Sequence, residues 1–474
     1  MAEHIGKPTE PEAWPCRSLR HFRAALKLAM TVVCKLASPC ISKSASPMPA
    51  RRLLILLLLF SMAHIPAHAQ LRGHGGPVRA LAVSGDGKRL VSGSFDTTAI
   101  TWTLATGAAA KVLRFHEGSV NAVAFLPDGR LATSGEDTRI AIWEAGADKP
   151  AHALAGHTAP VVGLAVSPDG RTLASASWDG TARLWPLTGG APRVLDGHQQ
   201  NVNGIAFMPD GRAVVTSGYD LTLRIWPLAG GSARIVTLPS PLNAVAVVPG
   251  GGIVTAGATG KVFFLSDAGE LQNEIEAAAV PIIALAASAD GKFIAASSIR
   301  GAVAIISSDN RKLERTLIGP GLPAWSIAFL PNNRDLVTGG TDRLIRFWNV
   351  LTGEHVGEVV MSGPADPLAA YEGDRGAEVY RACIACHTLK ADDGARAGPT
   401  LAGILGRRIA TLPGYDYSPA LKKLDIIWTP ETVSKLFEIG PSVYTPGTKM
   451  PEQRVGAEDR AALVKFLEKV TVKR

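Results

Sequence analysis

The sequence predicts an all-β propeller of seven four-stranded blades, followed by a small all-α domain. Between residues 70 and 360, histidines and tryptophans recur with a period of 41 or 42 residues, which indicates a blade-type repeat. Beyond residue 372 the apolar spacing becomes helical and a Cys-x-x-Cys-His run appears. With 474 residues, 46% of them hydrophobic and 19% charged, the chain is long enough for several globular domains.

The formal net charge of +8 is concentrated at the start of the chain. Residues 1–69 contain nine Lys and Arg against three Asp and Glu. Subtraction from totals of 49 and 41 leaves 40 basic and 38 acidic residues, a balance of +2. Because this remainder has almost no basic excess, no nucleic-acid partner is expected.

Residues 1–69 predict an N-terminal extension and an export signal. Arg51-Arg52 precede the apolar run Leu53 to Ala63, and the segment ends in Ala67-His68-Ala69, as secretory signal peptides do. The run is about eleven residues long, whereas a membrane-spanning helix needs about 20. We therefore expect cleavage after Ala69 and a periplasmic mature protein. An uncleaved membrane anchor is the alternative, and Met48 is a candidate start of translation.

Each repeat contains a strand, a tight turn, a second strand, an Asp turn and a third strand that ends in Trp. The tight turns are built on Asp-Gly, usually after Pro, because Pro presets the turn and Gly accepts a positive φ. We expect the ring to close without a strand from residues 70–73, and residues 355–360 to form the outer strand of the last blade. Among the expected strands are 120–125, 161–166, 202–207, 193–195 and 234–238.

These repeats resemble WD-repeat β-propellers over about 290 residues. The resemblance implies that each repeat histidine joins a buried hydrogen-bond chain, through a hydroxyl side chain, to the Asp and Trp of its blade. A metal site at the propeller axis is the alternative for the histidines. The motif fades in the fifth and sixth units, where Leu265 and Ile306 replace Trp. The repeat histidines are His74, His116, His157 and His198, and the hydroxyl and Asp pairs are Ser92/Asp96, Thr133/Asp137, Ser175/Asp179, Thr216/Asp220 and Thr338/Asp342.

Residues 361–371 predict a Pro-containing linker, and residues 372–474 a second domain. A helix expected over 376–385 carries Cys383, Cys386 and His387 at its end. Two thiols one turn apart, followed by an imidazole, are the pattern of covalent haem attachment with the histidine as iron ligand. A redox-active cysteine pair and half of a zinc site are the alternatives.

Residues 372–474 resemble class I c-type cytochromes. The resemblance implies that the Pro399 carbonyl accepts a hydrogen bond from the His387 ring, and that Met450 is the sixth ligand of one covalently bound haem c. The alternative for Met450 is a packing role. The resemblance also places four residues near the haem propionates, although ordinary packing or surface charge would explain them equally well: Tyr415, Tyr417, Arg407 and Trp428.

Two further features concern this domain. A last helix is expected over 457–470, with Leu463 and Phe466 crossing the first helix at Gly376. Pro419 and one extra residue between positions 428 and 450 depart from the cytochrome pattern, and both affect the propionate contacts more than the axial ligands.

With both axial positions filled, substrate cannot reach the iron, so the expected function is one-electron transfer with a redox partner protein. The propeller would serve as an interaction or docking platform, because it contains no linear catalytic signature. One alternative is an oxidoreductase whose catalytic site lies in the propeller and passes electrons to the haem. Another is an adaptor whose haem senses rather than transfers.

Overall fold

The computed structural model describes residues 70–356, 368–381, 383, 384, 386–390, 396–415, 417–448, 450 and 453–471. The predicted extension and signal peptide, residues 1–69, lie outside the described residues, as do 361–367 of the predicted linker. Within the described ranges, no helix is both long and apolar enough to cross a membrane.

Residues 70–349 form seven four-stranded antiparallel sheets, which confirms the predicted number of blades. The seventh blade contains β26 (Ser326–Phe329), β27 (Asp335–Gly339), β28 (Leu344–Asn349) and β1 (Gln70–Arg72). The strands of the first six blades, from inner to outer, are β2 (Val78–Val83), β3 (Arg89–Ser94), β4 (Thr98–Thr103), β5 (Ala108–Arg114); β6 (Val120–Phe125), β7 (Leu131–Gly135), β8 (Ile140–Trp143), β9 (His152–Leu154); β10 (Val161–Val166), β11 (Thr172–Ser177), β12 (Ala182–Pro186), β13 (Arg193–Leu195); β14 (Val202–Phe207), β15 (Ala213–Gly218), β16 (Thr222–Pro227), β17 (Arg234–Thr237); β18 (Leu242–Val247), β19 (Ile253–Gly257), β20 (Lys261–Leu265), β21 (Leu271–Glu276); β22 (Ile282–Ala287), β23 (Phe293–Ser298), β24 (Val303–Ser307) and β25 (Leu313–Leu317).

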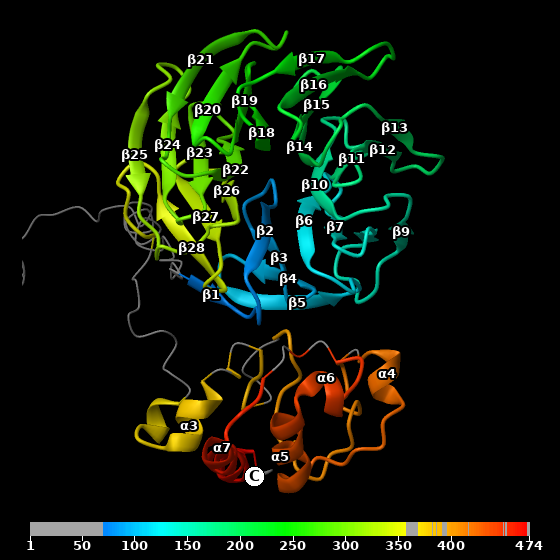
Figure 1. Ribbon diagram of the computed structural model, residues 1–474, viewed down its shortest axis with the longest axis vertical. Coiled ribbons are helices and arrows are strands. Elements are labelled where there is room, and N and C mark those ends of the chain that lie inside the picture. The colour runs from blue at the N-terminus through cyan, green and yellow to red at the C-terminus, as the bar shows by residue number, and fades with distance from the viewer. Residues whose placement is uncertain are drawn as a thin grey trace, which may run out of the picture. The chain divides into compact units, whose positions relative to one another are not determined.

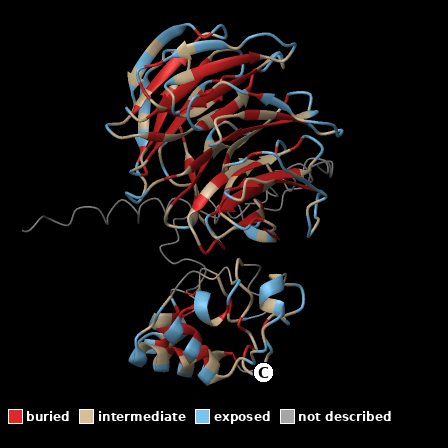
Figure 2. Ribbon diagram, turned by 45° about the vertical axis from the view of Figure 1, so that its right-hand side comes forward, coloured by how far each residue is buried: buried red, intermediate tan, exposed pale blue. Residues whose placement is uncertain are grey.

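The first strand of each blade lies innermost, and each inner strand contacts the inner strand of the next blade, so the sheets form a closed ring (Figure 1). Apolar side chains of neighbouring sheets pack between the blades. Figure 2 shows that much of the strand ribbon in this part is buried. In the first six blades the pairing of the inner strand skips one residue near its start, a β-bulge that re-aims that side chain. The skipped residues are Arg79, Asn121, Val162, Asn203, Asn243 and Ile283.

Four blades contain the predicted buried hydrogen-bond chain. In each, the histidine Nδ1 lies 2.7 to 3.0 Å from the Asp, and its Nε2 lies 2.7 to 2.9 Å from the hydroxyl oxygen. The tryptophan Nε1 donates to the same hydroxyl over 2.8 to 3.0 Å. Because indole can only donate and carboxylate can only accept, the chain runs from Trp through hydroxyl and His to Asp. Both ring nitrogens of each histidine are occupied, so a metal site formed by them is excluded.

The ring closes differently from the expectation. β1 pairs antiparallel with β28, with Gln70 opposite Arg346 and Arg72 opposite Leu344, so the expectation that residues 70–73 add no strand is wrong. His355 forms only an isolated bridge with Trp348, and residues 357–360 lie outside the described part. Two short segments, β1 and the bridge at His355, therefore cover the outer edge of β28. This pairing satisfies backbone N–H and C=O groups that an open edge would leave without partners.

The C-terminal part is helical, as predicted. Its elements are η1 (Ala369–Tyr371), α3 (Arg375–Tyr380), α4 (Pro419–Lys422), α5 (Pro430–Ile439), α6 (Pro441–Tyr444) and α7 (Ala457–Val470). α7 has the expected bounds, whereas α3 ends at Tyr380, five residues earlier than expected. The Cys-x-x-Cys-His run follows α3 as separate turns, in which the Cys383 N–H donates to the Tyr380 carbonyl over 2.8 Å.

α3 and α7 cross at Gly376, and this contact closes the core of the helical part. A Cβ added to Gly376 would lie only 2.5 Å from the Phe466 Cβ, so glycine is required for the close approach. The Tyr380 and Phe466 rings pack with centroids 5.6 Å apart, and Leu463 is 1% exposed. The predicted crossing of the two helices is confirmed.

Candidate cofactor site

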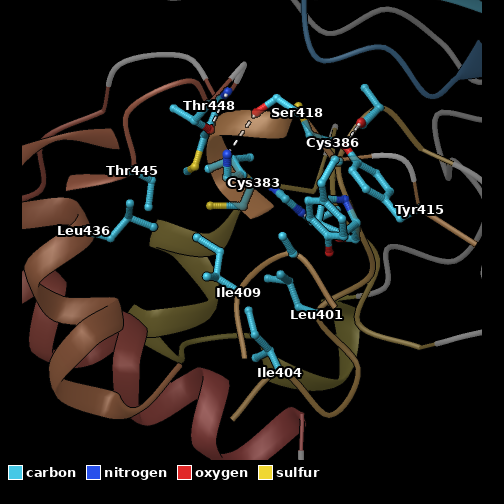
Figure 3. Close-up of a pocket in the computed structure, with 18 of the residues that line it drawn as sticks. Cys383, Cys386, Leu401, Ile404, Ile409, Tyr415, Ser418, Leu436, Thr445 and Thr448 are labelled. Carbon is cyan, nitrogen blue, oxygen red and sulfur yellow. Dashed lines mark hydrogen bonds between the residues drawn. The ribbon is translucent and has the colours of Figure 1, made fainter. Parts of the chain in front are cut away.

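A cavity in the helical part is lined mainly by apolar side chains. In Figure 3, the Cys383 sulfur and the side chains of Leu401, Ile409 and Leu436 surround one open space. The lining also includes Ile404, Trp428, Val433, Phe437, Leu463 and Leu467. α5 and α7 supply one wall, because their buried faces point toward the cavity. Such a cavity suits a large flat apolar ligand with few polar contacts.

Cys383, Cys386 and His387 stand on consecutive turns beside this cavity. The Cys386 N–H donates to the Cys383 carbonyl over 3.1 Å, and the His387 N–H donates to the same carbonyl over 2.9 Å. Both thiols are free. Burial raises the pKa of the Cys383 thiol to about 12 and that of Cys386 to about 11, so both are neutral near pH 7. Neutral buried thiols do not match the activated thiolate of a redox-active pair.

The His387 ring is fixed by the partner that the sequence predicts. Its Nδ1 lies 2.7 Å from the Pro399 carbonyl oxygen. Because a carbonyl can only accept, Nδ1 carries the proton and Nε2 keeps its lone pair. Burial lowers the pKa of His387, although the bond to Pro399 opposes this, and the ring is neutral. A neutral imidazole with a free Nε2 is the form that binds a metal.

Gly398 lets the Pro399 segment approach the histidine. A Cβ at position 398 would lie 2.5 Å from the His387 Cε1 and 2.7 Å from its Nδ1. The segment is also joined to the backbone of the Cys-x-x-Cys-His run, because the Gly398 N–H donates to the Cys386 carbonyl over 2.8 Å. The Leu401 N–H donates to the Thr388 carbonyl over 2.8 Å in the same way. The ring orientation of His387 is therefore set by main-chain contacts.

Met450 lines the same cavity as His387 and is half-buried in the core of the helical part. The Met450 N–H donates to the Thr448 Oγ1 over 3.1 Å, which fixes the loop on one side of the methionine. The loop is held from the other side by Ser418, whose hydroxyl donates to the Gly447 carbonyl over 2.9 Å. The structure thus brings the two predicted axial ligands, far apart in sequence, to one cavity.

The four predicted propionate residues also line this cavity. Arg407, however, uses its Nη2 to donate to the Thr400 carbonyl over 2.9 Å and its Nη1 to donate to the Ala402 carbonyl over 3.2 Å. The Tyr415 hydroxyl donates to the Ala397 carbonyl over 2.7 Å. Both residues therefore hold the segment that contains Pro399, a role that the sequence does not reveal. Contact of these residues with haem propionates stays a prediction.

Tyr417 and Trp428 are placed by their neighbours in the helical part. The Tyr417 ring lies against that of Tyr415, with centroids 4.6 Å apart. The Trp428 backbone exchanges hydrogen bonds with the strand-like segment at Gly406 and Arg407: its N–H donates to the Arg407 carbonyl over 3.0 Å. Within the described residues, no group of three or more His, Cys, Asp or Glu side chains is arranged to hold a metal ion.

Comparison with known proteins identifies both parts of the chain. The model of the family "Cytochrome c" matches residues 373–471. Cytochrome c type-1 of Ascaris suum is 40% identical over 109 residues, which are 22% of this chain and 92% of that protein. Through this domain the chain belongs to the cytochrome c family. Cytochrome c of Arabidopsis thaliana is 39% identical over 109 residues, 23% of this chain and 96% of that protein, and Cytochrome c 2.1 of Caenorhabditis elegans is 41% identical over 106 residues, 22% and 90% respectively.

The propeller matches a second family, "WD domain, G-beta repeat". Its model matches residues 67–103, 107–144, 148–186, 190–227 and 311–349. The matched segments include the five blades whose third strand ends in Trp. The fifth and sixth blades fall outside them, in agreement with the loss of Trp at Leu265 and Ile306. The chain is thus a fusion of WD repeats with a cytochrome c domain.

A cytochrome c domain implies a haem c cofactor and electron transfer, and the residues of this cavity fit that group. Two free thiols stand one turn apart, a neutral imidazole keeps its Nε2 lone pair, and a thioether lies at the same apolar cavity. When bound, a haem with His and Met ligands supplies a reversible one-electron change at the iron. The zinc alternative lacks the further ligands it requires, within the part of the chain that the structure describes.

Proposed function

We propose that this protein is an exported one-electron carrier with a single haem c. In this proposal, Cys383 and Cys386 hold the haem covalently, and His387 and Met450 are its axial ligands. The observation that carries the proposal is the convergence of these four side chains on one apolar cavity, with the His387 ring fixed by the Pro399 carbonyl. The hydrogen bond makes the imidazole a stronger donor to iron.

An electron carrier fits this cavity better than an enzyme acting at the iron. Two protein ligands leave no position for substrate at the metal. The apolar walls, including Leu401, Ile404 and Leu436, exclude water from the cofactor, which keeps the local dielectric low. Tyr417, Arg407 and Trp428 would support the propionate side of the haem, since all three line the cavity.

The propeller is proposed to dock a redox partner protein. Its buried Trp, hydroxyl, His and Asp chains fix four of the blades, so the loops at their ends form a rigid surface. A rigid surface reduces the entropy that is lost on binding. The oxidoreductase alternative requires a catalytic constellation in the propeller, and none is evident among its described residues.

Export to the periplasm is proposed from the sequence of residues 51–69. The export signal and the haem motif support each other, because c-type haem is joined to the polypeptide outside the bacterial cytoplasm in the family that this domain resembles. After cleavage, the chain would begin near Gln70 with Cys383 and Cys386 as its only cysteines. Mass spectrometry of the purified holoprotein tests this directly, and peptides from upstream of Ala69 would show that the segment is retained.

A pyridine haemochrome spectrum of the purified protein tests the cofactor. We expect one haem per chain, with the band position of two saturated vinyl groups, and retention of the haem after denaturation in acidified acetone. Cys383→Ala and Cys386→Ala should each shift the band toward that of haem with one free vinyl group. Haem that is extracted completely by acetone would contradict covalent attachment.

A second measurement separates a carrier from an enzyme. The haem of the full-length protein is reduced by a chemical donor and reoxidised by a protein acceptor, and its spectrum is followed with and without candidate organic substrates. A carrier exchanges electrons only with redox proteins or mediators. Steady reduction of the haem by an organic substrate alone would place a catalytic centre in the propeller.

A further inference from the structure

The joint between the first and last blades carries a cluster of aromatic and cationic side chains. Arg79 is the bulge residue near the start of β2, and its guanidinium carbon lies 5.2 Å from the centroid of the Trp325 ring. Trp325 precedes β26 and lies 6.2 Å, centroid to centroid, from Phe95, which follows β3. Phe95 is 43% exposed. We call Arg79, Phe95, Trp325 and the adjacent Thr341 the seam cluster.

The seam cluster is fixed before any ligand arrives. The Trp325 Nε1 donates to the Thr341 Oγ1 over 3.0 Å, and the Thr341 N–H donates to the Pro323 carbonyl over 3.0 Å. The Phe95 N–H donates to the Pro77 carbonyl over 3.1 Å. Across the joint, the Val78 N–H donates to the Gly340 carbonyl over 3.0 Å. The Trp325 ring is therefore fixed through Thr341, and the backbone that carries Phe95 is fixed to the segment before β2.

Arg79 is a half-buried cation for which the described part of the chain supplies no carboxylate within ion-pair distance. Other propeller arginines near this end of the blades have one: Arg139 lies 3.0 Å from Asp137, and Arg224 lies 3.7 Å from Asp220. Burial lowers the pKa of Arg79, which reflects the cost of a cation without a counter-ion. An incoming anion would remove that cost.

The surrounding charges favour an anion as well. The turn that contains Phe95 has equivalents in the sixth and seventh blades, where Arg300 and Arg343 are exposed. The Asp residues of the first four blades at this end are engaged with histidines and are 5 to 7% exposed. Glu117, in the second blade, is paired with Arg139 at 3.2 Å. Glu136, the second-blade equivalent of Phe95, is exposed and accepts hydrogen bonds from Ser119. The positive charge therefore lies on the side of the sixth and seventh blades, and an acidic group is steered to the seam cluster from that side.

We propose that the seam cluster binds a carboxylate side chain on an acidic segment of a partner protein, with an apolar side chain of that segment against Phe95. A guanidinium stacked on an indole keeps its edge free for a planar carboxylate, which it can bind through two hydrogen bonds. One arginine matches a single negative charge, whereas a phosphate dianion would call for more donors. This inference deepens the docking role in the proposed function and rests on it.

The probe is the peptide acetyl-Ala-Phe-Glu-Ala-amide, and its matched control has Gln in place of Glu. Both are titrated into the full-length holoprotein by calorimetry at low salt, with inorganic phosphate as a third ligand. We expect the Glu peptide to bind about tenfold or more tightly than the Gln peptide, because a charge-assisted pair is lost. Equal affinities of the unmodified protein for the two peptides would overturn the proposal. So would an affinity for inorganic phosphate equal to that for the Glu peptide.

Variants then locate the site. Arg79→Gln should weaken the Glu peptide about tenfold and leave the Gln peptide unchanged, and Phe95→Ala should weaken both peptides. Arg171→Gln makes the same charge change at an exposed turn on the opposite end of a blade and should change neither. If Arg79→Gln and Arg171→Gln reduce the affinity for the Glu peptide equally, the proposed site is wrong. Haem content and midpoint potential, measured on the same samples, separate a failure of this site from a failure of the electron-transfer function.

Discussion

Substitution of Gly398 by alanine tests whether the main-chain contact at His387 controls the haem iron. The new Cβ would lie 2.5 Å from the His387 Cε1, whereas ordinary contact begins near 3.4 Å, so the two groups must separate by about 0.9 Å (3.4 − 2.5). If the ring moves by that amount, its 2.7 Å bond to the Pro399 oxygen lengthens to about 3.6 Å, beyond hydrogen-bonding distance. The lost bond contributes about 1 kcal/mol, and position 398 has no positive φ to complicate the change.

The expected result is a haem that is still covalently attached but has a higher midpoint potential. Without its hydrogen bond, the imidazole is a weaker donor, and the ferric state loses more stabilisation than the ferrous state. The assay is a spectroscopic redox titration of the full-length protein, with haem content from the pyridine haemochrome. Gly456→Ala is the matched control, because position 456 has open space around its Cβ position. An unchanged potential in Gly398→Ala would refute the reasoning.

Three further predictions follow from the structure. Met450→Ala should lower the midpoint potential, since thioether ligands favour ferrous iron, and should abolish the charge-transfer band of the methionine–ferric bond. Met361→Ala should change neither. If Met361→Ala has these effects and Met450→Ala does not, Met361 is the ligand. Ser92→Ala leaves the Trp102 N–H and the His74 ring without their shared partner, and should lower the free energy of unfolding by about 2 to 6 kcal/mol. The control Ser134→Ala removes one hydrogen bond and should lower it by about 1 kcal/mol. Urea titrations measure both values. Burial alone would raise the pKa of the Asp96 carboxyl, but the contacts with His74 and Thr98 outweigh it and lower that pKa to about 2. The propeller should therefore lose stability as the pH falls from about 4 toward 2. A urea midpoint that does not change over this range would contradict this role of Asp96.

The blades could be predicted from the sequence because their hydrogen-bond chains impose fixed spacing. Each hydroxyl residue must lie four positions before its Asp and ten before its Trp, as Ser92 and Trp102 do, so the pattern is visible in a single chain. The strands over 120–125, 161–166 and 202–207 have the predicted bounds for the same reason. The fifth and sixth blades lack this Trp, and only the pattern of their strands predicts them.

Other features could not be predicted, because they depend on contacts between distant residues. β1 has only three residues, too few for a period, and its pairing partner lies at the far end of the propeller. Arg407 donates to backbone carbonyls, and no side-chain pattern encodes such acceptors. The seam cluster combines Arg79 with Trp325, which become neighbours only when the ring closes.

The candidate site lies between these cases. Cys383, Cys386 and His387 are adjacent in sequence, so their common position was expected, and the family motif indicated Pro399. The early end of α3 was not foreseen, since the run continues in hydrogen-bonded turns that keep helix-like spacing. Gly398 carries no chemistry of its own, and its importance appears only when the neighbouring ring is placed.

The closure of the propeller by β1 has a consequence for its assembly. Arg72 pairs with Leu344, a separation of 272 residues (344 − 72), so the ring can latch only after its last blade has been made. Until then, the outer edge of β28 presents unpaired backbone groups that accept any suitable strand. The three residues of β1 from one molecule can therefore pair with β28 of another and close its ring. At high concentration we expect exchanged dimers joined through this single blade, and removal of Gln70 to Arg72 should abolish them.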